Sequence, residues 1–196
     1  MSHKRLPFDF YARSALEVGP DLLNKVLAAP DGRAGRIVEV EAYRGADDPG
    51  SHGFRGMTRR NASMFGPPGH LYVYFTYGMH WCANVVAESE GVAAAVLLRA
   101  LTPLGGLEAM YAARGPAART ERDLCSGPAK LTQSLGIDGS LDGADLVTGD
   151  HGVTILDDGQ PPPPDPAVTT RIGLSNGTEL PWRFCVAGAA DLSRRF

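Results

Sequence analysis

Long apolar runs are absent from this sequence of 196 residues. No uninterrupted apolar stretch approaches the roughly 18 residues that a membrane-spanning helix needs, and the opening MSHKRLPFDFYARS lacks the apolar centre of a signal peptide. Cysteine is also scarce, since Cys82, Cys125 and Cys185 stand far apart with no Cys-x-x-Cys pair. These absences argue against a membrane protein and against a disulfide framework. We expect a cytoplasmic protein with reduced, mostly buried cysteines and no membrane partner.

A strong charge of either sign is missing as well. The formal net charge is −3, and the 19 cationic side chains comprise 16 arginines and only 3 lysines. This balance argues against a protein that coats nucleic acid through a general electrostatic attraction. It leaves specific nucleic-acid contacts open, because arginine binds phosphate in a bidentate manner that needs no positive total charge.

The remaining composition is that of an ordinary globular protein, with 43% hydrophobic and 21% charged residues. The length favours one domain over residues 1–196, since about 150 residues per domain is usual. Glycine and proline are abundant, at 24 and 15 residues, and indicate many shaped loops. The longest predicted loop, residues 44–69, contains at most one helical turn near residues 59–65, and loops of that length are usually functional.

Two β-hairpins are predicted from alternating apolar and polar residues. The first joins residues 26–29 to 35–43 through a turn at Pro30-Asp31-Gly32, with Val38, Val40 and Ala42 on one face and Glu39, Glu41 and Tyr43 on the other. The second covers residues 70–86, with Leu71, Val73 and Phe75 on one face and Tyr72, Tyr74 and Thr76 on the other. Tyr77 and Gly78 are expected at the tip of this second hairpin.

The other predicted elements alternate between helices and short strands. Ser14-x-x-Glu17 is a capping box that begins a helix, and Gly19-Pro20 must bend it. The full set is a helix over residues 14–29, a strand over 93–101, a helix from Thr102-Pro103 to Arg114, a helix opened by residues 126–128 and stopped by Gly136, and strands over 169–175 and 182–187.

The first hairpin carries a possible binding site. Glu41 and Tyr43 share a strand face about 7 Å apart, a spacing that could flank one small planar ligand. A half-solvated strand with an acidic outer face explains the same pattern. A third possibility is a metal site formed by Asp47, Asp48 and His52, although their spacing matches no recognised ligand set.

The second hairpin and the loop before it suggest a nucleic-acid contact. An aromatic side chain at a turn tip cannot be buried by its own strands, and Arg55, Arg59, Arg60 and Asn61 precede it as a possible phosphate clamp. The alternatives are a hairpin packed under another loop and a solvated charged face. Ser126, Gly127 and Lys130 at a predicted helix start could offer amide groups to an anion, or simply cap the helix.

Taken in order, four stretches of the sequence resemble the alkyladenine (3-methyladenine) DNA glycosylase family of base-excision repair. These are RIVEVEAYRGADDPGSH, TRRNASMFGPPGHLYVYFTYGMHWCANV, VLLRALTPLGGLEAM and LCSGPAKLTQSLGI. The resemblance extends from about Phe10 to Val186. It implies an α+β fold, a single mixed domain in which helices surround a curved antiparallel β-sheet and a β-hairpin protrudes.

The resemblance also implies a role for individual residues. Glu41 matches the general base that deprotonates water, with Arg99 and the backbone carbonyl of Ile172 holding that water. Tyr43 matches the residue that stacks on a flipped base, His52 and Tyr74 match the opposite wall, and Asn84 matches the residue that crowds the 2-amino group of guanine. Tyr77 matches the side chain that wedges into the duplex. The further DNA contacts implied are Met79, His80, Arg59, Arg60, Asn61, Ser126 and Lys130.

The implied function is that of a monofunctional DNA glycosylase, acting as a monomer on damaged double-stranded DNA without metal or cofactor. A single carboxylate suffices when the leaving base is cationic, as an alkylated purine is, whereas a neutral base must first be protonated. Three rival functions remain. A glycosylase that is also a lyase would need an amine, and only Lys4, Lys25 and Lys130 exist. The others are a non-enzymatic protein that flips and holds damaged bases, and a metal-dependent hydrolase.

Overall fold

The computed structural model describes residues 4–195, in which nine strands form one antiparallel sheet. The strands are β1 (Lys4–Arg5), β2 (Val26–Ala28), β3 (Ala34–Arg44), β4 (Leu71–Thr76), β5 (His80–Ala87), β6 (Ala94–Gly105), β7 (Thr154–Asp157), β8 (Ala167–Thr169) and β9 (Arg183–Cys185). Their order is β1-β7-β2-β3-β6-β5-β4, with β9 against β3 and β8 against β9. The α+β fold with an antiparallel sheet is therefore confirmed.

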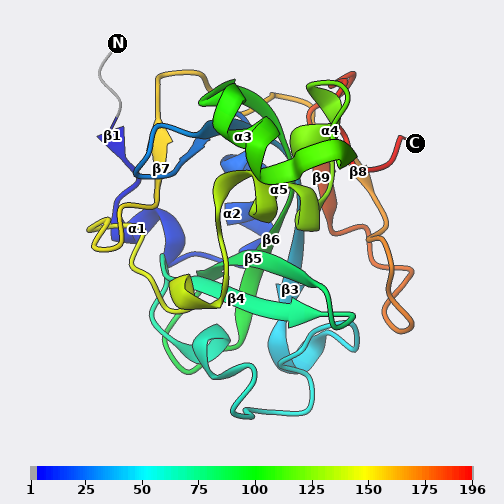
Figure 1. Cartoon of the computed structure of the whole chain (residues 1–196). Helices are drawn as coiled ribbons and strands as arrows, with labels where there is room; N and C mark the ends of the chain where they lie inside the picture. Colours follow the sequence, from blue (N-terminus) through cyan, green and yellow to red (C-terminus); the bar gives the residue numbers. More distant parts are fainter. Residues whose placement is uncertain (1–3, 196) are drawn as a thin grey trace.

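Short helices surround this sheet. They are α1 (Phe8–Tyr11), α2 (Ala15–Leu22), α3 (Leu107–Arg114), α4 (Arg122–Cys125) and α5 (Pro128–Leu135), with 3₁₀ turns η1 (Gly45–Asp47), η2 (Ala62–Phe65), η3 (Gly115–Ala117) and η4 (Gly139–Leu141). Figure 1 shows α3, α4 and α5 grouped at one end of the molecule, the loop of residues 45–69 at the opposite end, and the β4–β5 hairpin between them. The main core lies between the sheet and helices α2 to α5.

Both predicted hairpins are present. Strand β2 pairs with β3, and β4 pairs with β5 from Leu71–Val85 to Thr76–His80. At the tip of the second hairpin Tyr77 and Gly78 have φ angles of 51° and 67°. Glycine adopts this left-handed conformation freely, whereas a tyrosine does so at a cost. The backbone of the tip thus places a tyrosine where the turn itself would favour a smaller residue.

Strands β3 and β6 lie at the centre of the sheet, and each carries one extra residue at the same level. In β3 the extra residue falls between the pairs Ile37–Leu101 and Glu39–Ala100, and in β6 it falls between the pairs Glu39–Ala100 and Val40–Leu98. Val38 of β3 and Arg99 of β6 have no partner in this ladder. A bulge of this kind turns two successive side chains to the same face of the sheet.

The bulge on β3 changes the predicted alternation. Val40 and Ala42 belong to the main core, as expected, but Val38 does not share their face. Val38 packs instead into a second apolar cluster with Ala100, Cys185 and Leu192. The prediction for Val38 was wrong because an extra residue in a strand reverses the face of the residues before it.

Three helix and strand boundaries also differ from the prediction. Helix α2 begins after Ser14, whose Oγ accepts the N–H of Leu16, but it ends at Leu22 rather than near residue 29. Strand β6 continues through Thr102 and Pro103 to Gly105, so the next helix begins at Leu107. Pro103 is tolerated because only β3 pairs with this part of β6. Helix α5 ends at Gly136, as predicted, with a φ of 68°.

The second half of the chain contains less regular structure than the sequence predicts. The strand expected over residues 169–175 is confined to Ala167–Thr169, and the chain then bends irregularly toward β9. The strand expected over residues 182–187 is present as β9. The three cysteines are buried and unpaired, as expected. Within residues 4–195, no helix has the length and apolar character needed to cross a membrane.

Candidate active site

Glu41 lies in the middle of β3 with its side chain fully buried. Its two carboxylate oxygens accept three hydrogen bonds, from the Tyr43 hydroxyl (2.8 Å) and Arg99 Nη1 (3.3 Å) to Oε2, and from the Ile172 backbone N–H (2.7 Å) to Oε1. A buried carboxylate needs such partners to remain charged. The alternative of a solvated acidic outer face is therefore wrong for this strand.

Glu39 is the second buried carboxylate on the same face of β3. It accepts hydrogen bonds from Arg99 Nε (2.9 Å), Arg183 Nε (2.8 Å), and both the backbone N–H (2.6 Å) and the hydroxyl (2.7 Å) of Ser193. Burial alone would raise the pKa of Glu39, but Ser193, Arg183 and Arg99 together hold it below its ordinary value. Glu39 is thus a charged residue that holds Arg99, Arg183 and Ser193 in place.

Arg99 connects the two carboxylates. Its Nε contacts Glu39 and its Nη1 contacts Glu41, so that one guanidinium bridges both. The bulge at Arg99 makes this possible. It turns Arg99 and Ala100 to the face of the sheet opposite the main core, while Leu98 and Leu101 remain in that core. Burial lowers the pKa of Arg99, yet the charges of Glu41 and Glu39 outweigh burial, and its net pKa is raised.

A pocket of about 300 Å³ opens beside this network. A volume of this size is at the lower end of the range for small-molecule sites. Most of its lining residues are aromatic, small or polar: Tyr43, Gly50, His52, Met64, Tyr72, Tyr74, Thr76, Tyr77, Cys82, Asn84, Leu97, Arg99, Pro128, Ile172, Gly173 and Leu174. The structure therefore gathers residues from β3, β4, β5 and β6, from the start of α5, from the hairpin tip and from the loops of residues 45–69 and 170–182 around one space. Every predicted base-binding residue lines it.

His52 and two tyrosines of β4 form an aromatic cluster in this pocket. The ring of His52 lies edge-on to Tyr74 at a centroid distance of 4.5 Å, and its Nδ1 is 2.9 Å from the Tyr72 hydroxyl. Desolvation against these rings lowers the pKa of His52, and the nearby charge of Arg60 lowers it further. His52 therefore lines the pocket as a neutral imidazole. Tyr72 was not among the predicted site residues.

Asn84 lies on β5 directly across from Tyr72 in the β4–β5 pair. It is buried, and its side-chain Nδ2 donates to the Tyr72 carbonyl oxygen over 2.9 Å. This hydrogen bond fixes the amide where it lines the pocket. A fixed polar side chain at that point limits the shape of any ligand.

Tyr43 is held from behind by a buried ion pair. The guanidinium of Arg171 lies 4.5 Å from the centroid of the Tyr43 ring and 5.1 Å from that of Trp182. Arg171 binds both carboxylate oxygens of Asp48, and both side chains are fully buried. Burial, followed by the charge of Glu41, raises the pKa of the Tyr43 hydroxyl, which therefore acts as a hydrogen-bond donor.

The same ion pair argues against the metal site considered from the sequence. Asp48 is bound to Arg171, so it cannot join Asp47 and His52 as a free ligand. Among residues 4–195, no group of three or more histidine, cysteine, aspartate or glutamate side chains is arranged to hold a metal ion. The carboxylates of this loop therefore do not support a metal-dependent hydrolase.

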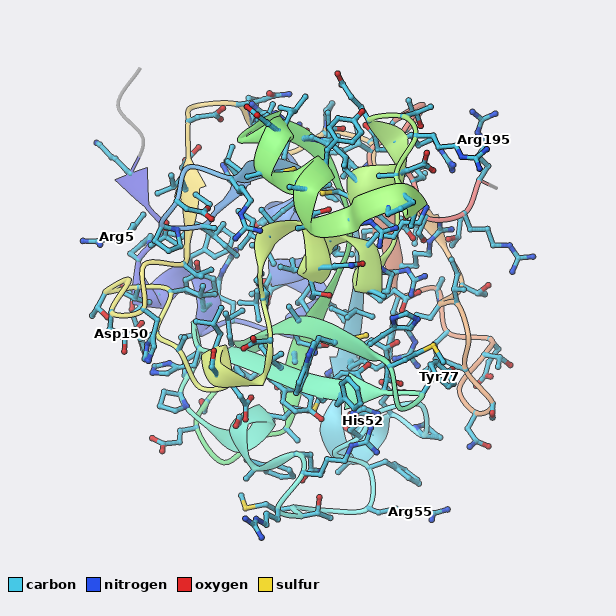
Figure 2. The ribbon with its side chains drawn as sticks, viewed as in Figure 1. Arg5, His52, Arg55, Tyr77, Asp150 and Arg195 are labelled. Atoms are coloured by element: carbon cyan, nitrogen blue, oxygen red, sulfur yellow. The ribbon has the colours of Figure 1, made fainter. Side chains whose placement is uncertain are left out.

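The rim of the pocket carries exposed aromatic and cationic side chains. Tyr77 is 82% exposed and Met79 is 67% exposed at the hairpin tip, next to an exposed His80. The tip of the hairpin is therefore not covered by another loop, although the base of β4 is buried beneath η2. In Figure 2 Tyr77 and His52 lie on the same side of the molecule, opposite Arg5.

The predicted phosphate clamp is divided between surface and interior. Arg59 and Arg60 are exposed, and Arg60 reaches the hairpin, where its Nη2 donates to the Phe75 carbonyl oxygen over 3.1 Å. Asn61, in contrast, is 3% exposed and uses its amide within the loop, bonding to Thr58, His52 and Gly56. The two arginines thus lie at the surface, whereas Asn61 holds the loop together from inside.

The start of α5 reaches the edge of the pocket through Pro128. Ser126 is buried, and its hydroxyl accepts a hydrogen bond from Lys130 Nζ over 3.2 Å. Lys130 also lies 3.9 Å from Asp123. The capping interpretation of Ser126 is wrong, because Gly127 is the N-cap of α5 and no side chain of residues 4–195 caps the start of this helix. The Ser126 hydroxyl is occupied by Lys130 instead, and the Lys130 side chain is partly exposed.

Some residues of the site carried no signal in the sequence. Arg171, Arg183 and Ser193 lie more than 120 residues after the carboxylates that they bind. Arg171 was assigned to a strand and Ser193 to no element, because local patterns do not record partners at that distance. The alternation of β3 placed Glu39 correctly on the same face as Glu41, but it did not indicate that Glu39 binds two arginines.

Comparison with known proteins agrees with this geometry. The family model described as "Methylpurine-DNA glycosylase (MPG)" matches residues 9–190. A protein of Burkholderia lata named "Putative 3-methyladenine DNA glycosylase" is 62% identical over 183 residues, which cover 93% of this chain and 88% of that protein. Proteins with the same name from Carboxydothermus hydrogenoformans and Streptomyces avermitilis are each 49% identical, and cover 97% and 91% of this chain and 99% and 85% of their own lengths.

Proposed function

The chain belongs to the methylpurine-DNA glycosylase family of hydrolases that act on N-glycosidic bonds, and from this premise we propose that it is a monofunctional glycosylase. It flips alkylated or deaminated purines out of duplex DNA, hydrolyses the N-glycosidic bond with an activated water and leaves an abasic site. The observation that carries this proposal is the fully buried carboxylate of Glu41, held by three hydrogen bonds next to an aromatic pocket.

Glu41 is the general base in this mechanism. A carboxylate has about four lone-pair positions, and three of those on Glu41 accept bonds from Tyr43, Arg99 and Ile172. One position remains to receive a proton from the attacking water. Arg99 holds the same water, and the carbonyl of Ile172 supplies a further contact. The buried setting keeps Glu41 fixed while positive charge develops on the deoxyribose in an oxocarbenium-like transition state.

The pocket selects the base. The rings of Tyr43, Tyr74 and His52 enclose a flipped purine, and a cationic alkylated purine gains from contact with aromatic faces. Such a base also leaves without a general acid, because its ring already carries the positive charge. Asn84 crowds the 2-amino group of guanine, so undamaged guanine is disfavoured. Unstacking costs less for a damaged or mispaired base, and selection begins at this step.

Exposed residues at the rim hold the duplex. Tyr77 wedges into the space that the extruded base leaves, with Met79 and His80 beside it, while Arg59, Arg60 and Lys130 contact phosphates. These cations supply a local positive surface on a chain whose net charge is −3. The partner is damaged double-stranded DNA, and the enzyme acts as a single-domain monomer in the cytoplasm.

Two rival functions make different demands on the site. A lyase needs an amine near the sugar, but none of the three lysines lines the pocket, and Lys25 is paired with Asp157. A protein that only holds damaged bases has no use for a buried carboxylate, whose charge repels phosphate. The lining of the pocket therefore favours hydrolysis by a monofunctional enzyme.

The proposal is tested with a set of duplexes, each containing one 3-methyladenine, 7-methylguanine, hypoxanthine or ethenoadenine. After incubation with the protein, heating in alkali cleaves the strand wherever the base has been released. We expect cleavage at one or more alkylated purines, no trapping of protein on DNA by borohydride, and no effect of EDTA. Base binding without cleavage at every lesion would contradict the proposal, as would a borohydride-trapped adduct.

A further inference from the structure

The last part of the described chain closes over the network that orients Arg99. Leu192 is 3% exposed and packs into the apolar cluster of Val38 and Ala100 beneath it. The segment is also fixed from two other elements, by Thr102 of β6, whose hydroxyl donates to Asp191 over 2.7 Å, and by Arg122 of α4, which donates to the carbonyl oxygens of residues 190 and 192. This C-terminal segment, residues 190–195, is thus held against the folded domain through Leu192 and its hydrogen bonds.

Ser193 is the residue of this segment that reaches the network. Its backbone N–H donates to Glu39 Oε2 over 2.6 Å, and its hydroxyl donates to Glu39 Oε1 over 2.7 Å. The same hydroxyl oxygen accepts a hydrogen bond from Arg99 Nη2 over 3.1 Å. Because a hydroxyl donates once and accepts through its lone pairs, the bond to Glu39 orients the oxygen toward Arg99.

Arg99 is consequently held on three sides. Its Nε contacts Glu39, its Nη2 contacts Ser193, and its Nη1 is left facing Glu41. A guanidinium is planar and rigid, so fixing two of its nitrogens determines where the third one points. With Glu39 alone, the group keeps freedom to tilt about the Nε contact. The hydroxyl of Ser193 removes that freedom.

We propose that Ser193 is a positioning residue for base release, which aims Arg99 at Glu41 and at the attacking water that these two residues hold. This inference rests on the proposed function, because it assigns Ser193 a part in that reaction. Ser193 lies beyond residue 190, where the match to the family model ends, yet it contacts the same guanidinium as Glu41 does. Ser193 itself does not line the pocket, so its effect falls on the rate of base release and not on the affinity for the base.

The test compares three variants under single-turnover conditions with enzyme in excess. Ser193→Ala removes the hydroxyl, and Ser193→Thr retains it. Ser134→Ala is the matched control, because Ser134 is a fully buried serine that does not line the pocket, and its hydroxyl donates to the Leu124 carbonyl oxygen. Binding is measured separately on a duplex with a 2′-fluorinated alkylpurine nucleotide, in which the fluorine destabilises the oxocarbenium ion and blocks hydrolysis.

We expect Ser193→Ala to release base about 10-fold more slowly than the wild type, which corresponds to about 1.4 kcal/mol in the barrier. Its Kd for the fluorinated duplex should remain within about twofold of the wild-type value. Ser193→Thr should recover most of the rate. Ser134→Ala should lower the melting temperature and leave the rate unchanged, because a purely structural serine affects only stability.

Three results would overturn the inference while the proposed function stands. These are an unchanged rate in Ser193→Ala, a parallel loss of rate and affinity, and a rate in Ser134→Ala that falls as far as in Ser193→Ala. If Ser193→Ala does not fold, Ser193→Thr decides the matter, since a folded threonine variant with a wild-type Kd and a rate reduced 10-fold or more would contradict a role for the hydroxyl. A wild-type enzyme that releases no base from any lesion would overturn both proposals together.

Discussion

The hydroxyl of Tyr43 donates a hydrogen bond to Oε2 of Glu41 over 2.8 Å, although both side chains leave the same strand two residues apart. The strand spacing predicted two groups about 7 Å apart that could flank a ligand. In the folded protein they touch, so the aromatic wall and the carboxylate form one unit. A base that stacks on Tyr43 is thereby placed at a fixed distance from Glu41.

Replacing Glu41 by glutamine should separate binding from hydrolysis. Glu41→Gln keeps the shape of the side chain but removes the proton acceptor, so we expect lesion binding to survive while base release falls by roughly 10² or more. Single-turnover kinetics and binding to the fluorinated duplex measure the two effects. Tyr43→Phe is the comparison, because it retains both the ring and the carboxylate and should lose less activity. Equal losses of binding and release in Glu41→Gln would show that Glu41 is structural.

Asn84 should determine the ratio between guanine-type and adenine-type substrates. Its amide is held in the pocket by the Tyr72 carbonyl oxygen, and the shorter serine side chain in Asn84→Ser would open space for a 2-amino group. We expect release of 7-methylguanine to rise relative to 3-methyladenine. The adenine-type substrate serves as the internal control for any general loss of activity. A ratio equal to that of the wild type would reject this role.

Tyr77 should contribute to base flipping and very little to folding. Tyr77→Ala removes an 82% exposed ring, so the melting temperature should stay within a few degrees, while the population of flipped base falls roughly 10- to 100-fold. A fluorescent base analogue at the target position reports that population.

Tyr77→Gly is the matched control for this experiment. The φ of 51° at Tyr77 favours glycine, so this variant should be more stable than Tyr77→Ala by about 1 kcal/mol and yet flip equally poorly. Flipping that survives in both variants, or unfolding of Tyr77→Ala, would contradict the role of Tyr77 as the wedge.

Arg60 should account for about one phosphate contact. For a duplex, the logarithm of the binding constant falls with the logarithm of salt concentration with a slope near −0.9 per contact. Arg60→Ala should make this slope shallower by about one. Arg5→Ala is the control, because Arg5 lies on the opposite side of the molecule from Tyr77 in Figure 2. Identical slopes in the wild type and Arg60→Ala would exclude the contact.

Glu39 should make the stability of the protein fall in acid. Its pKa in the folded protein lies below the ordinary value, so its charged partners contribute stability above that ordinary value and lose it as the pH drops through the folded-state pKa. Glu39→Gln should be less stable at neutral pH by about 3 kcal/mol, and the difference from the wild type should shrink toward pH 3. Urea unfolding at a series of pH values measures this. A difference that stays constant over the series would contradict the assignment.

Short-range patterns in the sequence predict much of this fold. Alternation identified both hairpins, and Gly78 among five aromatic residues between Tyr72 and Trp81 identified the exposed tip. Glycine and proline marked the limits of α5 correctly. Each of these features depends on residues that are close together in the chain, and local conformational preferences are sufficient to specify them.

Features that depend on distant partners were not predictable from such patterns. Thr102-Pro103 has the local preference of a helix start, but pairing with β3 keeps it extended. Likewise, nothing near Arg171 or Ser193 in the chain indicates that each will bind an acidic residue of the first 50 positions. The direct contact of Tyr43 with Glu41 also required the folded backbone.

The two central bulges have a consequence for how this sheet tolerates change. Val38 and Arg99 are single additions, one in each strand, so the strands return to a common register on both sides of them. Each bulge turns two successive side chains to one face, so removing Val38 or Arg99 alone would restore simple alternation and leave the neighbouring side chains on their present faces. Removing a residue elsewhere in the middle of either strand would instead exchange inside and outside for every side chain beyond that point. The sheet therefore accepts a change of length in β3 or β6 only at these bulges, and at Arg99 such a change would cost the contact with Glu41.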